Sequence, residues 1–192
     1  MSEKVIKSRN WSAVVYPESL PKNWLDILQD LRIPIAVSPL HDKDVNPDGE
    51  IKKAHYHLII CFDGPTTLNN VIECVTKPLN APNPVKCLSV RGSWRYFMHL
   101  DNPDKAAYSG HDIKYLGGFD IQDYLSSSEI TKCILKIHEI IIENKIIEYW
   151  DLMEYLRINQ YFDYYQIASN HTLYFNSLLK SRNYKVKKII NK

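Results

Sequence analysis

The chain has 192 residues and a formal net charge of +2, with 45% hydrophobic and 24% charged residues. These are the proportions of an ordinary soluble protein with one domain, or one domain and a small second module. No stretch reaches the roughly 20 uncharged apolar residues of a membrane span, and the first residues lack the apolar core of a signal peptide. The four cysteines are far apart and form no CxxC pair, which indicates reduced thiols and a cytoplasmic protein.

Strand and helix patterns alternate over the first part of the chain. Segments rich in β-branched and aromatic residues predict strands at 10–16, 34–40, 54–62 and 85–91. Apolar stripes at helical spacing predict helices at 21–31, 68–77 and 94–100. The short link between the second and third strands favours antiparallel neighbours. The order β-α-β-β-α-β-α, with two helices on one face of an antiparallel sheet, predicts an α+β fold of the ferredoxin-like or RRM-like type.

From residue 126 onward the strand patterns stop and helical patterns continue. Ser126 and Glu129 match a capping box at a helix start. A long isoleucine stripe follows at positions 130, 134, 137, 141 and 147. Two further helices are expected at 151–158 and 172–180. We therefore expect a first domain over residues 1–126 and a small all-α domain over residues 127–192.

The end of the chain is basic. Its cationic residues are Lys180, Arg182, Lys185, Lys187, Lys188 and Lys192. Such a run can contact nucleic acid or form a solvated tail, and the sequence favours neither interpretation.

The expected strand at 54–62 carries the strongest chemical signal. Successive side chains of a strand point to opposite faces. One face is apolar throughout and can be buried; it carries Tyr56, Leu58, Ile60 and Phe62. The other face begins with two imidazoles, His55 and His57, about 7 Å apart along the strand, which is a spacing that can bind one ion. Two surface histidines would give the same pattern, so the pair alone does not identify a metal site.

A second group of ligand types lies at the end of the preceding strand. If the two strands are neighbours, His41 and Asp44 lie close to His55 and His57. Nitrogen and hard oxygen donors without thiolate suit Mn²⁺, Mg²⁺ or Zn²⁺. They argue against a structural zinc site, which usually includes cysteine. We therefore predict a divalent metal site, with Asp42 as the alternative carboxylate.

The expected third helix carries a candidate nucleophile. Tyr96 and His99 are three residues apart and share one face of that helix. A tyrosine hydroxyl is a weak nucleophile at its free pKa of about 10. It becomes useful when a metal polarises the electrophile and a positive neighbour favours the phenolate. Tyr108 and Tyr115 are the alternative nucleophiles, and His111 and the later histidines lack ligand-like neighbours.

Six segments resemble, in order and spacing, the RepB-type rolling-circle plasmid replication initiators. These proteins belong to the HUH endonucleases, a superfamily named for a His-hydrophobic-His strand. The segments are Tyr16–Pro21, Ser38–Asp44, Lys52–His57, Tyr96–His99, Asp112–Lys114 and Phe119–Ile121. The HxH pair alone is unspecific, but the combined set is highly specific and covers most of the chain.

The resemblance implies an enzyme that nicks and joins single-stranded DNA at a plasmid origin. His55 and His57 would be the HUH ligands, with His41 and Asp44 completing a site for Mn²⁺ or Mg²⁺. Tyr96 would attack the scissile phosphate and hold its 5′ end as a phosphotyrosine. The freed 3′-hydroxyl would prime synthesis, and a second transfer would close the displaced circle.

The residues around Tyr96 differ from the family pattern at one position, and this bears on the expected number of catalytic tyrosines. Relatives tend to carry a second aromatic residue two positions before the nucleophile, and that place is Trp94 here. The resemblance therefore implies an enzyme with one catalytic tyrosine. Arg91, Arg95 and His99 are the candidates for DNA contact, although the two arginines could equally lie on a solvated face.

The resemblance also implies partners and a location. These are origin DNA, with duplex repeats and a single-stranded nick site, further copies of the chain bound through the helical domain, and the bacterial cytoplasm. No GxxxxGK[ST] motif occurs, so a host helicase and polymerase are expected. The alternatives are a non-catalytic origin or RNA binder, a relaxase-type mobilisation protein, and a non-haem iron oxygenase with a 2-His-1-carboxylate site.

Overall fold

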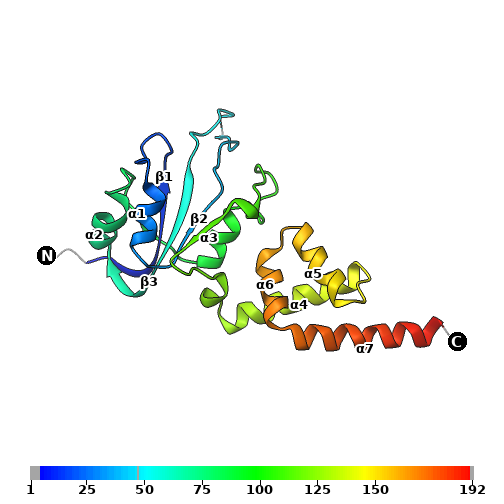
Figure 1. Cartoon of the computed structure of the whole chain (residues 1–192). Coiled ribbons are helices and arrows are strands. Elements are labelled where there is room, and N and C mark those ends of the chain that lie inside the picture. Colours follow the sequence, from blue (N-terminus) through cyan, green and yellow to red (C-terminus); the bar gives the residue numbers. More distant parts are fainter. Residues whose placement is uncertain (1–4, 47, 191–192) are drawn as a thin grey trace. The chain divides into compact units, whose positions relative to one another are not determined.

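The computed structural model describes residues 5–46 and 48–190, with side chains described up to residue 184. The chain divides into two compact units, Met1–Ile121 and Gln122–Lys192. The first contains an antiparallel sheet with helices, and the second is helical (Figure 1). The predicted α+β class is therefore confirmed. Among the described residues, no helix is long and apolar enough to cross a membrane.

The sheet of the first unit has five strands in the order β4-β1-β3-β2-β5. Their bounds are β1 Lys7–Val15, β2 Ile35–Val37, β3 Tyr56–Thr67, β4 Val85–Lys86 and β5 Lys114–Leu116. Every neighbouring pair is antiparallel. The first four strands follow the ferredoxin-like plan expected from the sequence. The fifth strand, at the edge beside β2, was not predicted.

One face of the sheet is covered by two helices, α1 (Trp24–Asp30) and α2 (Leu68–Val71), the latter continuing as the π-helix η1 (Ile72–Thr76). The residues packed there include Trp11, Val15, Leu28, Leu58, Ile60, Val71 and Val75, each fully buried. Thr67 starts α2, because its hydroxyl accepts a 3.2 Å hydrogen bond from Asn70 N. The apolar face of β3 is therefore buried as its alternation predicted, and the histidine face is turned the other way.

The helix on the histidine side is α3 (Val90–Tyr96), and the sequence prediction of its bounds was wrong. Ser89 is its N-cap, since the hydroxyl accepts a 3.0 Å hydrogen bond from Gly92 N. The chain therefore turns into the helix before Gly92, and β4 ends at Lys86 instead of continuing to residue 91. The helix stops at Tyr96, and His99 adopts a left-handed φ of 55° shortly after it. Two 3-10 helices follow, η2 (Gly110–Asp112) and η3 (Ile121–Tyr124).

The described residues of the second unit form four α-helices. They are α4 (Ser127–Glu143), α5 (Tyr149–Ile158), α6 (Phe162–Asn170) and α7 (Thr172–Ile190). The capping box is present, because Ser126 N donates to Glu129 Oε2 at 2.9 Å and Glu129 N donates to Ser126 Oγ at 3.3 Å. The apolar core includes Ile137, Ile141, Leu152, Leu156, Ile167 and Phe175.

Three details of the helical unit differ from the sequence prediction. Helix α6 was missed, Ile147 lies beyond the end of α4, and α7 continues past residue 180. Within the basic end, Lys180 and Arg182 lie on α7. The side chains of Lys185, Lys187 and Lys188, and the whole of Lys192, lie outside the described part of the chain.

Candidate metal and nucleophile site

Four imidazoles and one carboxylate meet on the histidine side of the sheet. His41 and His55 face each other across an isolated β-bridge, in which each backbone N–H donates to the other residue's carbonyl at 2.9 and 3.1 Å. This bridge extends the β2–β3 pairing and places His57 beside them. Asp44 and His99 complete the group, and both are buried, at 5% and 4% exposure. The strand pairing thus joins ligands that are far apart in the sequence.

Three of these histidines each donate one ring N–H to a backbone carbonyl. The bonds run from His41 Nε2 to Phe97 O (2.9 Å), from His55 Nδ1 to Lys53 O (2.7 Å) and from His99 Nδ1 to Ala106 O (2.7 Å). A carbonyl oxygen has no proton to donate, so the nitrogen that faces it must carry one. The tautomer of each neutral ring follows from this network, and its second nitrogen presents a lone pair.

The lone-pair nitrogens point into the cluster. His41 Nδ1 lies 3.4 Å from Asp44 Oδ2, and His55 Nε2 lies 3.2 Å from His57 Nε2. His41 Nδ1 and His99 Nε2 have no hydrogen-bond partner among the described residues. Buried lone pairs that face one another or a carboxylate are costly unless a cation or proton lies between them.

The donor set fits a divalent metal ion. The possible ligand atoms form two groups, and within each group all of them lie within 4.8 Å of one another. The first group comes from His41, His55 and His57, and the second from His41, Asp44 and His99. Histidine ligands of metals typically donate their outer N–H to a carbonyl or carboxylate, which is the pattern around His41, His55 and His99. Nitrogen and carboxylate donors without a thiolate suit Mn²⁺, Mg²⁺ or Zn²⁺.

Burial favours the neutral form of two of the cluster's imidazoles, those of His57 and His41. Burial, with smaller contributions from the neighbouring His41 and His55, lowers the pKa of His57 to about 3, while Asp44 acts in the opposite direction. Burial likewise lowers the pKa of His41. A neutral imidazole is the form that binds a metal ion, so the site needs no deprotonation of these two rings near neutral pH.

Tyr96, at the end of α3, lies next to this cluster. Its ring centroid is 5.3 Å from that of His57 and 4.8 Å from that of His99. Lys105 Nζ donates a 2.8 Å hydrogen bond to the Tyr96 hydroxyl and lies 4.5 Å from the ring centroid. The ammonium therefore contacts the oxygen that would act as nucleophile. A positive neighbour was expected from the sequence, but Lys105 was not identified, because it lies in a loop without a pattern.

The two arginines predicted to contact DNA both lie on α3, which precedes this loop. Arg95 makes two 2.9 Å hydrogen bonds to Asp101, from Nε and from Nη2. This pairing lowers the pKa of Asp101, and the charge of Arg91 adds to the effect. The ion pair ties α3 to the start of the loop that carries Lys105. Arg95 therefore has a structural partner, and its predicted DNA contact stays a prediction, as does that of Arg91.

The alternative tyrosines have other contacts. Tyr108 stacks on His41 with ring centroids 4.2 Å apart, accepts a 2.8 Å hydrogen bond from Lys43 N and donates a 3.3 Å bond to Asp44 Oδ1. Tyr115 accepts a 3.1 Å hydrogen bond from Trp94 Nε1. Burial raises the pKa of both phenols, which disfavours their phenolate forms.

The remaining sequence candidates lie as follows. Asp42, the alternative carboxylate, is exposed, whereas Asp44 is buried in the cluster. His111 is exposed, His138 Nε2 lies 2.8 Å from the Tyr174 hydroxyl, and His171 Nδ1 donates to Ile167 O at 2.9 Å. His99 is buried and has a ring nitrogen near the ligand atoms of His41 and Asp44, and its predicted DNA contact stays a prediction.

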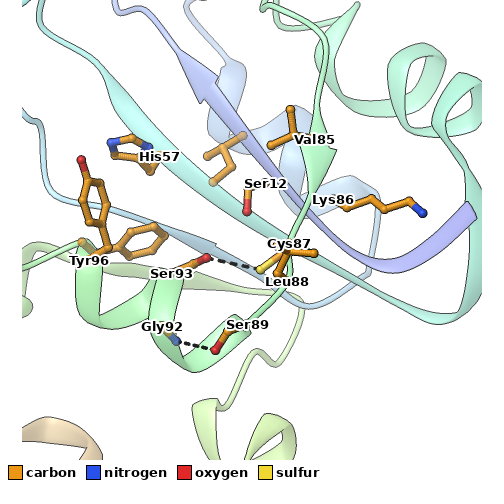
Figure 2. Close-up of a pocket in the computed structure, with 12 residues that line it drawn as sticks. Ser12, His57, Val85, Lys86, Cys87, Leu88, Ser89, Gly92, Ser93 and Tyr96 are labelled. Carbon is orange, nitrogen blue, oxygen red and sulfur yellow. Dashed lines mark hydrogen bonds between the residues drawn. The ribbon is translucent and has the colours of Figure 1, made fainter. Parts of the chain in front are cut away.

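A cleft opens beside Tyr96 and His57 (Figure 2). It has a volume of about 470 Å³ and lies between α3, the segment that includes β4, and the strands β1 and β3. The site therefore combines a cluster of metal-ligand types, a phenol in contact with an ammonium, and an adjoining cavity.

Comparisons with known proteins agree with the resemblance found in the sequence. A family model described as "Plasmid replication protein, origin binding domain" matches residues 3–122, and one described as "Replication protein RepB, C-terminal" matches residues 127–184. Replication protein RepB of Lactiplantibacillus plantarum is 40% identical over 91% of this chain and 81% of its own length. A replication protein of Staphylococcus aureus is 36% identical over 96% of this chain and 98% of its own length. The chain therefore belongs to the RepB family of plasmid replication initiators, and its first part is an origin-binding domain.

Proposed function

We propose that this initiator is a nicking and joining endonuclease, which cuts a single strand at the plasmid origin through Tyr96. The observation that carries the proposal is the position of the Tyr96 hydroxyl, which lies beside a cluster of metal-ligand types and accepts a hydrogen bond from Lys105. A protein that only bound the origin would need neither a phenol in contact with an ammonium nor buried imidazoles with inward lone pairs.

The metal site is proposed to consist of His41, Asp44, His55 and His57, holding Mn²⁺ or Mg²⁺. When bound, the ion would supply positive charge that stabilises the phosphoryl oxygens of the scissile phosphate. The carbonyls of Phe97 and Lys53 hold two of these rings with their lone pairs directed inward.

The reaction is a transesterification. The Tyr96 oxygen forms a bond to the scissile phosphorus as its proton leaves, and the bond from phosphorus to the 3′-oxygen breaks. The leaving oxygen takes up a proton and becomes a 3′-hydroxyl. The ammonium of Lys105, which donates a hydrogen bond to the Tyr96 hydroxyl, would stabilise the negative charge that develops on this oxygen during attack. The tyrosyl ester conserves the free energy of the phosphodiester bond that was cut, so rejoining requires no ATP.

The partners follow from this activity. Origin DNA would be bound through its duplex repeats, with the nicked strand unpaired so that it can reach the pocket. Arg91, Arg95 and His99 remain the proposed DNA contacts. A host helicase would separate the strands, and a host polymerase would extend the freed 3′-hydroxyl. The helical unit would join copies of the chain, and its exposed Trp150 and Leu173, at 75% and 85% exposure, offer apolar surface for such contacts.

The test uses a labelled single strand that covers the plasmid's own origin. With Mn²⁺ the wild-type chain should form a covalent protein–DNA adduct that survives denaturation, and EDTA should abolish it. Tyr96→Phe should form no adduct, whereas the matched variant Tyr108→Phe should still form one. An adduct with Tyr96→Phe would show that the nucleophile is another residue.

A further inference from the structure

The cleft beside Tyr96 leads away from the metal cluster. Tyr96 and His57 line it near the cluster, and Leu88 and Val85 lie farther along it (Figure 2). Ser12 of β1 also lines the cleft. A chemical group attached to a phosphate at the Tyr96 hydroxyl would therefore lie next to this cleft.

The lining of the cleft is largely neutral. Val85 and Leu88 are apolar and exposed, at 63% and 96%. Hydroxyl groups come from Ser12 and Ser93, and the Ser93 hydroxyl has only a 3.4 Å contact with the Cys87 thiol. Apolar surfaces with a few hydroxyls suit a flat, uncharged heteroaromatic ring with polar edges, and the volume of about 470 Å³ is that of a small-ligand pocket.

An anion is a poor match for the same lining. Lys86 is the one lysine or arginine among the described lining residues, and Figure 2 shows its side chain directed away from His57 and Tyr96. The Ser89 hydroxyl is used as the cap of α3, where it accepts from Gly92 N. Lys105 contacts the Tyr96 hydroxyl but does not line the cleft, so a phosphate placed in the cleft would meet no cation other than Lys86 among the described lining residues.

We propose that the cleft binds the nucleobase of a nucleotide that directly flanks the scissile phosphate, and that it selects this base. The proposal rests on the proposed nicking function. A base joined to that phosphate through one sugar must lie beside Tyr96, where the cleft begins. Packing against Leu88 and Val85 accepts any base and holds it in place, and this positioning lets the hydroxyls of Ser12 and Ser93 distinguish one base edge from another.

The first test reads base preference directly. The full chain is incubated with Mn²⁺ and a pool of single strands with a randomised segment, and both strand ends produced at the cut are sequenced. Leu88→Ala and Ser93→Ala should weaken the preference at one position next to the cut by about tenfold, with other positions unchanged. Leu135→Ala, which changes an exposed leucine on α4 of the helical unit, is the control and should behave as the wild type.

The second test does not require cleavage. Leu88→Cys is introduced together with Tyr96→Phe, and its rate of labelling by a maleimide is measured by peptide mass spectrometry. Oligo(dT) should slow labelling severalfold, whereas an abasic oligomer of the same length, which keeps the phosphates, should not. Leu135→Cys in the same Tyr96→Phe background should be labelled at the same rate without DNA, with oligo(dT) and with the abasic oligomer.

The two tests separate the two proposals. If the wild type forms adducts, unchanged base preferences in Leu88→Ala and Ser93→Ala overturn the assignment of the cleft while nicking stands. If it forms no adduct with any strand, the nicking function fails, and the labelling result alone decides the cleft. Equal labelling with oligo(dT) and the abasic oligomer then overturns it.

Discussion

Lys105 Nζ lies 2.8 Å from the Tyr96 hydroxyl oxygen, although the two residues belong to different elements. The lysine lies in the loop after α3, and this loop is tied to the helix by the ion pair between Arg95 and Asp101. It is tied to the metal cluster as well, because His99 Nδ1 donates to Ala106 O. The ammonium is therefore held against the phenol by contacts on both sides of it in the sequence.

Lys105→Met should slow adduct formation by about 100-fold, the usual effect of removing one stabilising donor at a reacting oxygen. Lys105→Arg should retain more activity, because it keeps the positive charge. The measurement is the single-turnover rate of adduct formation. Lys136→Met is the control, since Lys136 pairs with Glu139 on the helical unit. Equal rates for Lys105→Met and wild type would show that the contact has no role in the reaction.

Removing a ligand from the cluster should weaken metal binding. Asp44→Asn and His55→Gln are each expected to lower Mn²⁺ affinity by at least about 100-fold, measured by calorimetry. His138→Gln, whose ring contacts Tyr174 away from the cluster, should leave the affinity unchanged. An unaltered affinity in Asp44→Asn would contradict the proposed ligand set.

His99 can be assigned by the same experiment. Its Nε2 is buried without a partner among the described residues, and its Nδ1 lies 3.7 Å from Asp44 Oδ1. A ligand role predicts that His99→Gln lowers Mn²⁺ affinity by about tenfold or more. If His99 only contacts DNA, His99→Gln should bind single-stranded DNA more weakly and keep the wild-type affinity for Mn²⁺.

The metal-free protein should lose stability in acid. Burial holds the pKa of His57 at about 3, below the about 6.5 of an unfolded chain, so the unfolded state binds more protons between these values. The contribution is complete above about pH 6.5 and is lost as the pH falls toward about 3, by up to ~1.4 kcal/mol per pH unit for one ring. Urea unfolding in EDTA at a series of pH values measures this slope. His57→Gln should have a shallower slope, and an equal slope would contradict the assignment.

The capping box of the helical unit gives a prediction independent of the active site. Ser126→Ala removes the hydroxyl that accepts from Glu129 N and should lower the free energy of unfolding of this unit by about 1 kcal/mol. Ser181→Ala, at an exposed position within α7, should have little effect. Circular dichroism at 222 nm during thermal unfolding measures the stability of both variants. Equal unfolding midpoints for Ser126→Ala and wild type would show that the cap does not contribute.

The sequence predicted features that depend on local periodicity. The alternation of β3 placed His55 and His57 opposite the apolar core, and Ser126 with Glu129 marked the start of α4. The start of α3 was misplaced, because Gly92 looks like a helix breaker, while the capping bond that starts the helix comes from Ser89. A cap of this kind depends on backbone geometry that residue type alone does not specify.

Other features depend on contacts distant in the sequence. Helix α6 was missed, because its residues Phe162–Asn170 are rich in tyrosine and polar groups and have a weak apolar stripe. Lys105 lies in a polar loop that nothing in the local pattern connects to Tyr96. The choice of Asp44 over Asp42 likewise required the structure, since both follow His41 closely and only burial separates them.

The most direct measurement is the identity of the residue that becomes linked to DNA. The wild-type chain is incubated with Mn²⁺ and a single-stranded origin oligonucleotide, digested with nuclease and protease, and analysed by mass spectrometry. The account predicts a nucleotide 5′-phosphate attached to the peptide that contains Tyr96. Attachment at Tyr108 or Tyr115, or cleavage of the strand without any linked peptide, would contradict it.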